Sequence, residues 1–148
     1  MKTDSRPVDH WRTWLLAASA GVALFGLLLV LSPAAARLGF SVMIYGSTGT
    51  IDAFGREQVG YISLVHAVLG GVMVGWGFAL FYAVKTFFVK NPGGTWNLVA
   101  GSLVAWFVPD TAYSLVSGYW PNALLNGGFA VVFFIPLWAT RGARQSVI

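Results

Sequence analysis

Four long apolar stretches, separated by more polar segments, set the pattern of this chain. They cover approximately residues 14–31, 61–84, 96–116 and 123–140. Each is close to the ~20 residues with which an α-helix crosses ~30 Å of hydrocarbon. Because the stretches are long and do not alternate strictly between apolar and polar residues, they predict transmembrane helices rather than barrel strands.

The first apolar stretch also has features of a signal peptide. Lys2, Arg6 and Arg12 precede it, and three alanines follow it at positions 34–36. Its apolar run is nevertheless longer than the roughly 7–15 residues that are typical of a signal-peptide core. We therefore expect this stretch to form a transmembrane helix.

The connections between the apolar stretches differ in length. Residues 118–122 form a tight hairpin, so the third and fourth stretches are expected to be antiparallel neighbours. Residues 32–60 are too many for a structureless connection in a compact protein. Within them, residues 34–45 are apolar apart from one arginine and predict a short interfacial helix in the first outer loop. Together these elements predict an all-α, integral membrane four-helix bundle that forms a single transmembrane domain over residues 1–148.

Lysine and arginine residues are unevenly distributed over the ends of these stretches. Seven of them lie on one predicted side of the membrane: Lys2, Arg6, Arg12, Lys85, Lys90, Arg141 and Arg144. Only Arg37 and Arg56 lie on the opposite side. Because positive charges accumulate on the cytoplasmic side of membrane proteins, both termini are expected in the cytoplasm, with the chain in a bacterial-type inner membrane.

The composition agrees with a membrane protein and narrows its chemistry. Of the 148 residues, 57% are hydrophobic and 9% are charged, whereas about a quarter of a soluble domain is charged. There is no cysteine, which excludes disulfides, thiolate catalysis and iron–sulfur clusters. The formal net charge of +4 comes from basic residues at helix ends, where topology explains them, so nucleic acid is not an expected partner.

Three polar residues fall at similar depths in three different stretches. At ~1.5 Å of rise per residue, His66 lies about 7 Å, Asp110 roughly 9–12 Å and Asn126 about 6–7 Å below the outer helix ends. A carboxylate in hydrocarbon is costly and usually faces protein or water, so these residues predict a polar layer in the outer half of the membrane. Pro109 removes the hydrogen bond to the carbonyl of Ala105 and predicts a kink beside Asp110.

Steps of three and four residues extend this polar layer along the helix faces of His66 and Asp110. The polar or amphipathic side chains that these steps reach are Ser63, Trp106, Tyr113 and Ser114. Gly70 lies on the face of His66, where a glycine lets another backbone or a ligand come close. Three roles remain open: locking the bundle, binding a small apolar or amphipathic ligand, or relaying a proton through a His66–Asp110 pair.

Catalysis and metal binding receive less support from the residues. No nucleophile motif accompanies His66 and Asp110, so we name no catalytic residue and expect a protein that is not an enzyme. His10 is expected before the first span on the inner side and His66 in the outer half of the membrane, so the two cannot bracket one haem within a subunit. We therefore predict no metal site, and the pattern names no cofactor.

A row of small residues lies on the second stretch. Ala67, Gly71 and Gly75 follow the small-xxx-small spacing that lets membrane helices approach closely. Ala17 and Gly21 of the first stretch have the same spacing. The row therefore predicts either close packing within the chain or association with a second copy or a partner.

The order of these features resembles that of a known group of membrane proteins. The first span ends in Leu31-Ser32-Pro33, a long outer segment follows, the second span is glycine-rich over residues 70–77, and the third ends near Gly118 and Pro121. In this organisation the chain is similar to the small four-helix membrane proteins of the DoxX and DUF4345 type. The resemblance implies the four-helix fold and brings no activity with it.

We therefore expect a non-enzymatic integral membrane protein. It is either an accessory or assembly subunit of a larger membrane complex, or a binder of a small apolar or amphipathic ligand in an outer-half pocket. The alternative is a proton-coupled transporter or small membrane enzyme that uses His66 and Asp110. The expected partners are the lipid bilayer, further copies or subunits of a membrane complex, and a small apolar ligand.

Overall fold

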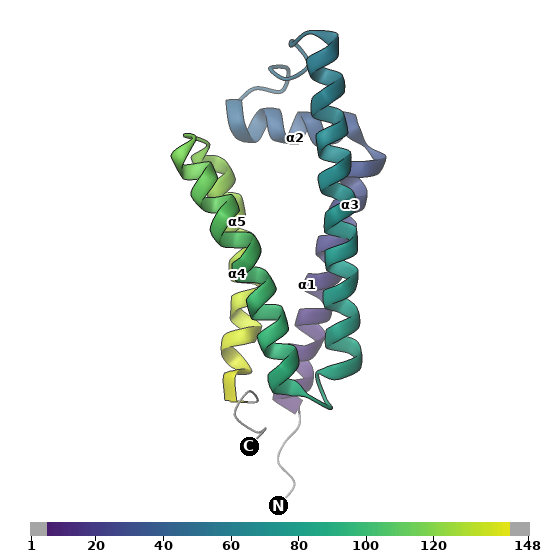
Figure 1. Ribbon diagram of the computed structural model, residues 1–148, viewed down its shortest axis with the longest axis vertical. Helices are drawn as coiled ribbons and strands as arrows, with labels where there is room; N and C mark the ends of the chain where they lie inside the picture. Colours follow the sequence, from purple (N-terminus) through teal and green to yellow (C-terminus); the bar gives the residue numbers. More distant parts are fainter. Residues whose placement is uncertain (1–5, 143–148) are drawn as a thin grey trace, which may run out of the picture. The chain divides into compact units, whose positions relative to one another are not determined.

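The computed structural model describes residues 6–142 of the chain, and for residues 6–8 the backbone alone. Its five helices are α1 (Arg6–Leu31), α2 (Pro33–Tyr45), α3 (Arg56–Phe87), α4 (Pro92–Val116) and α5 (Trp120–Ala139) (Figure 1). Within the described residues there is no strand, so the predicted all-α class is confirmed. Lys2 and Arg144, which entered the orientation prediction, lie outside the described residues.

Four of the helices are long and apolar enough to cross a membrane, namely α1, α3, α4 and α5. They contain the four predicted apolar stretches, apart from one residue beyond the end of α5. The short helix predicted over residues 34–45 is present as α2. The helical elements expected from the apolar pattern are therefore confirmed, and they are compatible with a multi-pass membrane protein.

Prolines and one glycine mark helix ends in this chain. Pro33 and Pro92 occupy the first positions of α2 and α4, where a backbone N–H would have no partner within the helix. At the start of α4, the side chain of Asn91 accepts a hydrogen bond of 2.9 Å from the backbone N–H of Gly94. Gly46 ends α2 in the left-handed conformation, at φ 66°, and donates its N–H to the carbonyl of Val42.

The chain divides into two compact units, and each is described by itself. Among the described residues, the first unit comprises 6–20 and 79–142, and the second comprises 21–78. Because α1 and α3 are long, each contributes residues to both units.

In the first unit, α4 and α5 pack against each other as antiparallel neighbours, as their short connection predicts (Figure 1). At one end of the pair, the Nε1–H of Trp96 donates to the carbonyl of Leu137 at 2.8 Å. Pro136 interrupts the hydrogen bonding of α5 and frees the carbonyl of Val132, four residues earlier. The Nε1–H of Trp14 donates to that carbonyl at 3.0 Å, so the group freed by the proline is satisfied.

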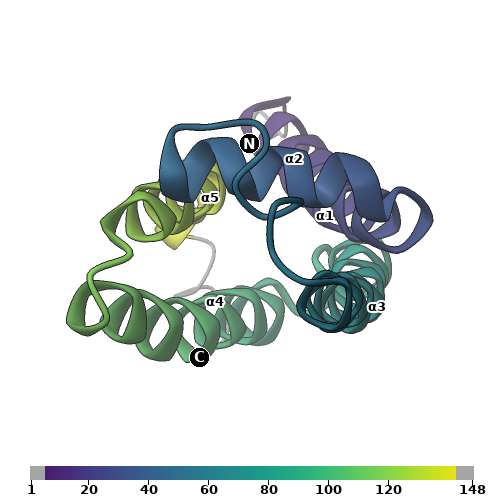
Figure 2. The same cartoon turned by 90° about the horizontal axis from the view of Figure 1, so that it is seen from above.

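In the second unit, α1 and α3 cross at two glycines. A Cβ atom on Gly70 would lie 2.5 Å from the carbonyl oxygen of Gly26, and a Cβ atom on Gly26 would lie 2.5 Å from that of Gly70. Only glycine at both positions permits this approach of the two backbones, as expected for the face of Gly70. The third helix of this unit, α2, runs across the direction of α3 (Figures 1 and 2).

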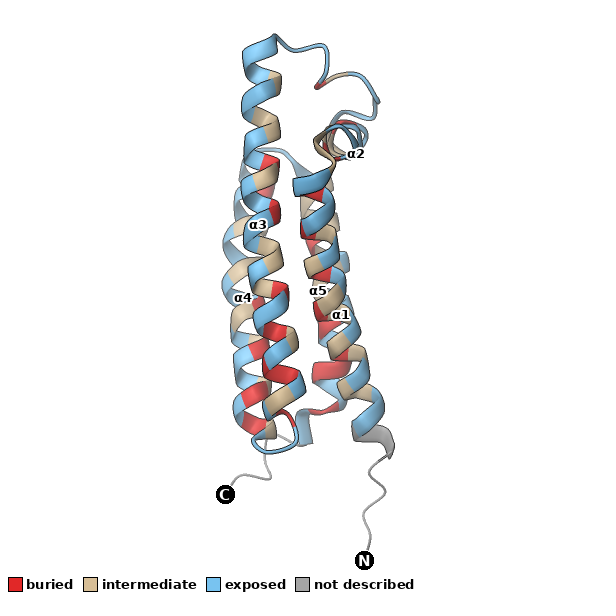
Figure 3. Cartoon of the chain, turned by 90° about the vertical axis from the view of Figure 1, so that its right-hand side faces the viewer, coloured by how far each residue is buried: buried red, intermediate tan, exposed pale blue. Residues whose placement is uncertain are grey.

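Large apolar side chains are exposed along the four long helices. In their most apolar segments, between 17% and 28% of the residues are buried inside the protein. Figure 3 shows exposed residues along the length of α1, α3 and α4. Examples of the exposed apolar side chains are Leu24, Leu31, Leu64, Val72, Val104, Val116 and Leu124. Exposed apolar surface of this extent is unusual for a protein in water and is compatible with a multi-pass membrane protein.

Candidate polar sites

Asp110 lies in the hairpin of α4 and α5, where its carboxylate has two side-chain donors. Its Oδ1 accepts hydrogen bonds from Nδ2 of Asn122 at 3.0 Å and from the hydroxyl of Ser114 at 3.4 Å. Nδ2 of Asn122 also lies 2.8 Å from the hydroxyl of Ser114, which closes a small network between the two helices. Helix α4 continues through Pro109, which precedes this network. The acid is therefore held by polar groups of its own hairpin.

Asn126, the third member of the predicted layer, is buried in the same hairpin. Its Nδ2 donates to the hydroxyl of Thr111 at 3.3 Å. Ser114 is buried as well, whereas Tyr113 is exposed and Trp106 is half-buried. Asn126 thus pairs with α4 one residue beyond Asp110, and Asn122 supplies the contact to the carboxylate.

A second polar cluster lies where α2 crosses α3, and we name it the α2–α3 corner. Arg37 of α2 forms an ion pair with Asp52, with 2.6 Å between Nε and Oδ1. Its Nη1 donates to the hydroxyl of Ser63 of α3 at 2.9 Å. One turn further along both helices, the ring of Phe40 stacks on the ring of His66, with 4.6 Å between centroids and 22° between planes. The corner therefore consists of Arg37, Phe40, Asp52, Ser63 and His66.

The imidazole of His66 is the unusual group of this corner. The residue is 8% exposed, and its Nδ1 is buried with no hydrogen-bond partner among the described residues. Leaving a buried polar group unpaired costs about 1–3 kcal/mol. The stacking on Phe40, of the order of 0.5–1.5 kcal/mol beyond the buried area, holds the ring in place without satisfying that nitrogen.

The loop between α2 and α3 folds back onto the corner. The hydroxyl of Ser41, in α2, donates to the carbonyl of Ser47 at 2.6 Å and accepts from the N–H of Ile51 at 3.3 Å. These two hydrogen bonds hold the loop close to α2, which is what brings Asp52 to Arg37. The loop therefore positions the carboxylate that neutralises the arginine.

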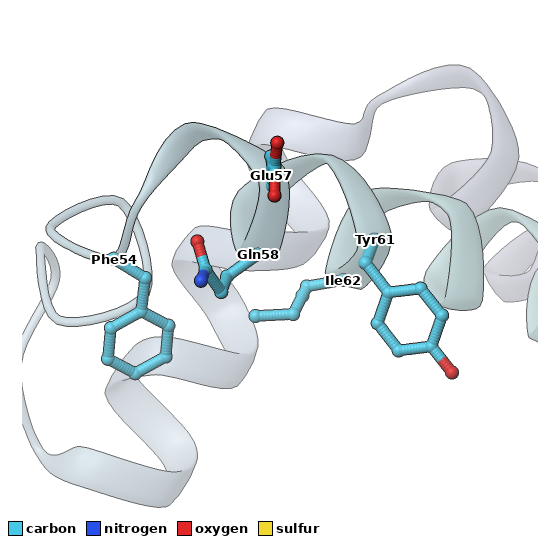
Figure 4. A pocket seen from close by; sticks show the side chains of 5 residues that line it. All are labelled: Phe54, Glu57, Gln58, Tyr61 and Ile62. Atoms are coloured by element: carbon cyan, nitrogen blue, oxygen red, sulfur yellow. The ribbon is translucent and has the colours of Figure 1, made fainter.

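An open hollow lies beside the first turns of α3 (Figure 4). It is lined by Phe54, Glu57, Gln58, Tyr61 and Ile62. Figure 4 shows Gln58 and Ile62 on the same side of the helix, facing the ring of Phe54 across the hollow. Gln58, Ile62 and His66 follow one another at steps of four residues, so the hollow lies on the helix face that leads to His66.

The structure groups the predicted site residues by unit. Asp110, Ser114 and Asn126 belong to one unit, and Ser63 and His66 belong to the other. The predicted pairing of His66 with Asp110 remains a prediction. The residues that sequence reasoning did not assign to a site are Asn122, Thr111, Arg37 and Phe40. For Arg37 and Phe40 a signal existed, because they lie three residues apart on the predicted interfacial helix and share one face.

Within the predicted row of Ala67, Gly71 and Gly75, the two glycines do not lie at the close crossing of α1 and α3. A Cβ atom added to Gly71 or Gly75 would meet no atom within 4 Å, whereas Gly70 touches the backbone of Gly26. Gly71 and Gly75 are exposed. Association of this row with a second copy or another membrane helix remains a prediction.

Over residues 9–142, no three histidine, cysteine, aspartate or glutamate side chains are arranged to hold a metal ion. In comparisons with known proteins, no family model, no curated protein and no solved structure matched this chain. The resemblance to the DoxX and DUF4345 type therefore remains a prediction.

Proposed function

We propose that this chain is a multi-pass integral membrane protein with both termini in the cytoplasm of a bacterial-type cell. The support is the exposure of large apolar side chains along the four long helices, which lipid solvates better than water does. Positive charge at the proposed inner helix ends supports this orientation, because basic residues accumulate on the cytoplasmic side of a membrane. The described residues that supply it are Arg12, Lys85, Lys90 and Arg141. In this orientation, α2 lies along the outer surface and the α2–α3 corner lies in the outer half of the membrane.

The proposed function is the non-enzymatic binding of a small amphipathic molecule at the α2–α3 corner. The observation that carries it is the buried Nδ1 of His66, which has no described partner. A polar group of a bound molecule would satisfy this nitrogen and remove the cost of leaving it unpaired. Phe40 stacks on the imidazole and fixes the plane of the ring. The apolar part of the molecule would lie along the exposed apolar side chains of α3.

Native mass spectrometry of the protein, extracted from membranes in a mild detergent, tests this proposal. The wild-type protein is expected to carry a small molecule, and His66→Phe is expected to lose it because the ring is kept and the nitrogen removed. His10→Phe is the matched control, since His10 is exposed and belongs to the other unit. The proposal fails if the wild-type protein carries nothing or if His66→Phe retains the molecule. Additional protein subunits in the same spectra would support the accessory role.

A further inference from the structure

We infer that the α2–α3 corner selects an amphiphile with an uncharged headgroup that bears hydroxyl or carbonyl oxygens, such as a monoacylglycerol. This inference rests on the proposed binding function and concerns the chemistry of the ligand. It follows from the charges around His66 and from the position of the hollow on α3.

The nitrogen of His66 requires a polar partner rather than a purely apolar one. Its Nδ1 is buried, and the residue is 8% exposed, so bulk water has little access to it. A hydroxyl group can donate to or accept from an imidazole nitrogen, and a carbonyl oxygen can accept from it. An alkane-like ligand would leave the nitrogen unpaired and gain nothing at this position.

The only charges of the corner are already paired with each other. Arg37 and Asp52 are 2.6 Å apart, and Arg37 also donates to Ser63, one helical turn from His66. Because Asp52 already balances the charge of Arg37, an anionic headgroup would give this cluster a net negative charge, and a cationic headgroup would give it a net positive charge. A charge brought into an apolar environment without its own partner is strongly disfavoured. An uncharged headgroup is therefore the one that best fits the neutral pair of Arg37 and Asp52.

Polar side chains also lie at the hollow beside α3. Among its lining residues Glu57 is acidic, and the neighbouring Arg56 is basic. Gln58, an uncharged amide, lies on the same face as His66 and eight residues before it, which is about 12 Å along the helix. In the proposed complex, the imidazole binds the ester end of a glycerol headgroup, and the hydroxyl groups of the headgroup lie toward Gln58. The acyl chain then continues along the apolar side chains below His66.

Nuclear magnetic resonance of the imidazole of His66 provides the test. The chain has 2 histidines, so ¹⁵N-histidine labelling in a His10→Gln background leaves His66 as the single reporter. The protein, in phosphatidylcholine nanodiscs, is titrated with monoolein, oleate and oleylamine, which share a chain and differ in headgroup charge. Monoolein is expected to shift the His66 nitrogen resonances saturably, at a concentration at least about tenfold lower than the other two, the factor that corresponds to about 1.4 kcal/mol.

A variant that removes the negative charge of the corner tests the role of the ion pair in selecting the headgroup. Asp52→Asn removes the partner of Arg37 and is expected to reverse the preference, so that oleate binds more tightly than monoolein. Asp9→Asn, at an exposed position of the other unit, is the matched control and is expected to leave the order of the three headgroups unchanged. If Asp52→Asn does not fold, the three titrations of the His10→Gln protein still decide the inference.

Two results would overturn the inference. If oleate or oleylamine binds as tightly as monoolein, the headgroup is not selected for its lack of charge, while binding at the corner still holds. If none of the three shifts the resonances of His66, the headgroup class is wrong. The co-purification experiment then decides the proposed function separately, because a molecule lost from His66→Phe keeps that function and a protein without any bound molecule contradicts it.

Discussion

The crossing of α1 and α3 gives a prediction whose size follows from the structure. Gly70→Ala adds one methyl group that would lie 2.5 Å from the carbonyl oxygen of Gly26 and 2.9 Å from the Cβ of Leu29. The first neighbour is backbone and cannot rotate away, so the two helices must separate. Overpacking of this kind typically costs about 1–3 kcal/mol. Against it stands the gain of about 1 kcal/mol in helix propensity when alanine replaces glycine.

The neighbouring Gly71→Ala is the matched control, because its methyl group would meet no atom within 4 Å. This variant is expected to be as stable as the wild type or more stable by up to about 1 kcal/mol, from helix propensity alone. The measurement is reversible unfolding of the purified protein in mixed micelles by a denaturing detergent, followed by circular dichroism. Gly70→Ala is expected to be less stable than Gly71→Ala by about 1–3 kcal/mol. Equal stability of the two variants would refute the close crossing at Gly26 and Gly70.

Other contacts lead to further predictions. Asn122→Ala removes the amide donor of Asp110 and is expected to lower the free energy of unfolding by about 1–3 kcal/mol in the same assay; an unchanged value would mean that the network contributes no stability. Trp14→Phe keeps an aromatic ring but loses the hydrogen bond to α5, with an expected cost of about 0.5–1.5 kcal/mol, and a more stable variant would contradict that role. For topology, single cysteines at Thr48 and Val89 can be introduced into a chain that has none. In intact cells, an impermeant thiol reagent is expected to label position 48 and not position 89, and the opposite pattern would reverse the proposed orientation.

The elements of this protein follow from local properties of the chain. Long apolar runs predict the four long helices, and Pro33 and Pro92 mark where two helices begin. The helix α2 was recognisable because residues 34–45 are apolar in a segment that is too long for a simple loop. These signals depend only on residues that are close in the sequence, which explains why the structure contains the helices that they predict.

The contacts of the polar residues were harder to predict, because they depend on how one helix faces another. Spacing along a helix identifies Ser114 as a neighbour of Asp110, yet it gives no register between α4 and α5 and therefore missed Asn122. The stacking of Phe40 on His66 needed the direction in which α2 crosses α3. Gly70 and Gly71 illustrate the same limit, since adjacent residues of a helix differ by about 100° in direction and only one of them meets Gly26.

The most direct test of the proposed binding site is photocrosslinking with a monoacylglycerol that carries a diazirine in its acyl chain near the ester. The labelled peptides are identified by mass spectrometry, with and without an excess of unlabelled monoolein. We predict saturable labelling within residues 33–45 and 56–70, which contain α2 and the start of α3, and we predict that monoolein abolishes it. Labelling spread over all exposed apolar helices, unaffected by monoolein, would contradict a binding site at the α2–α3 corner.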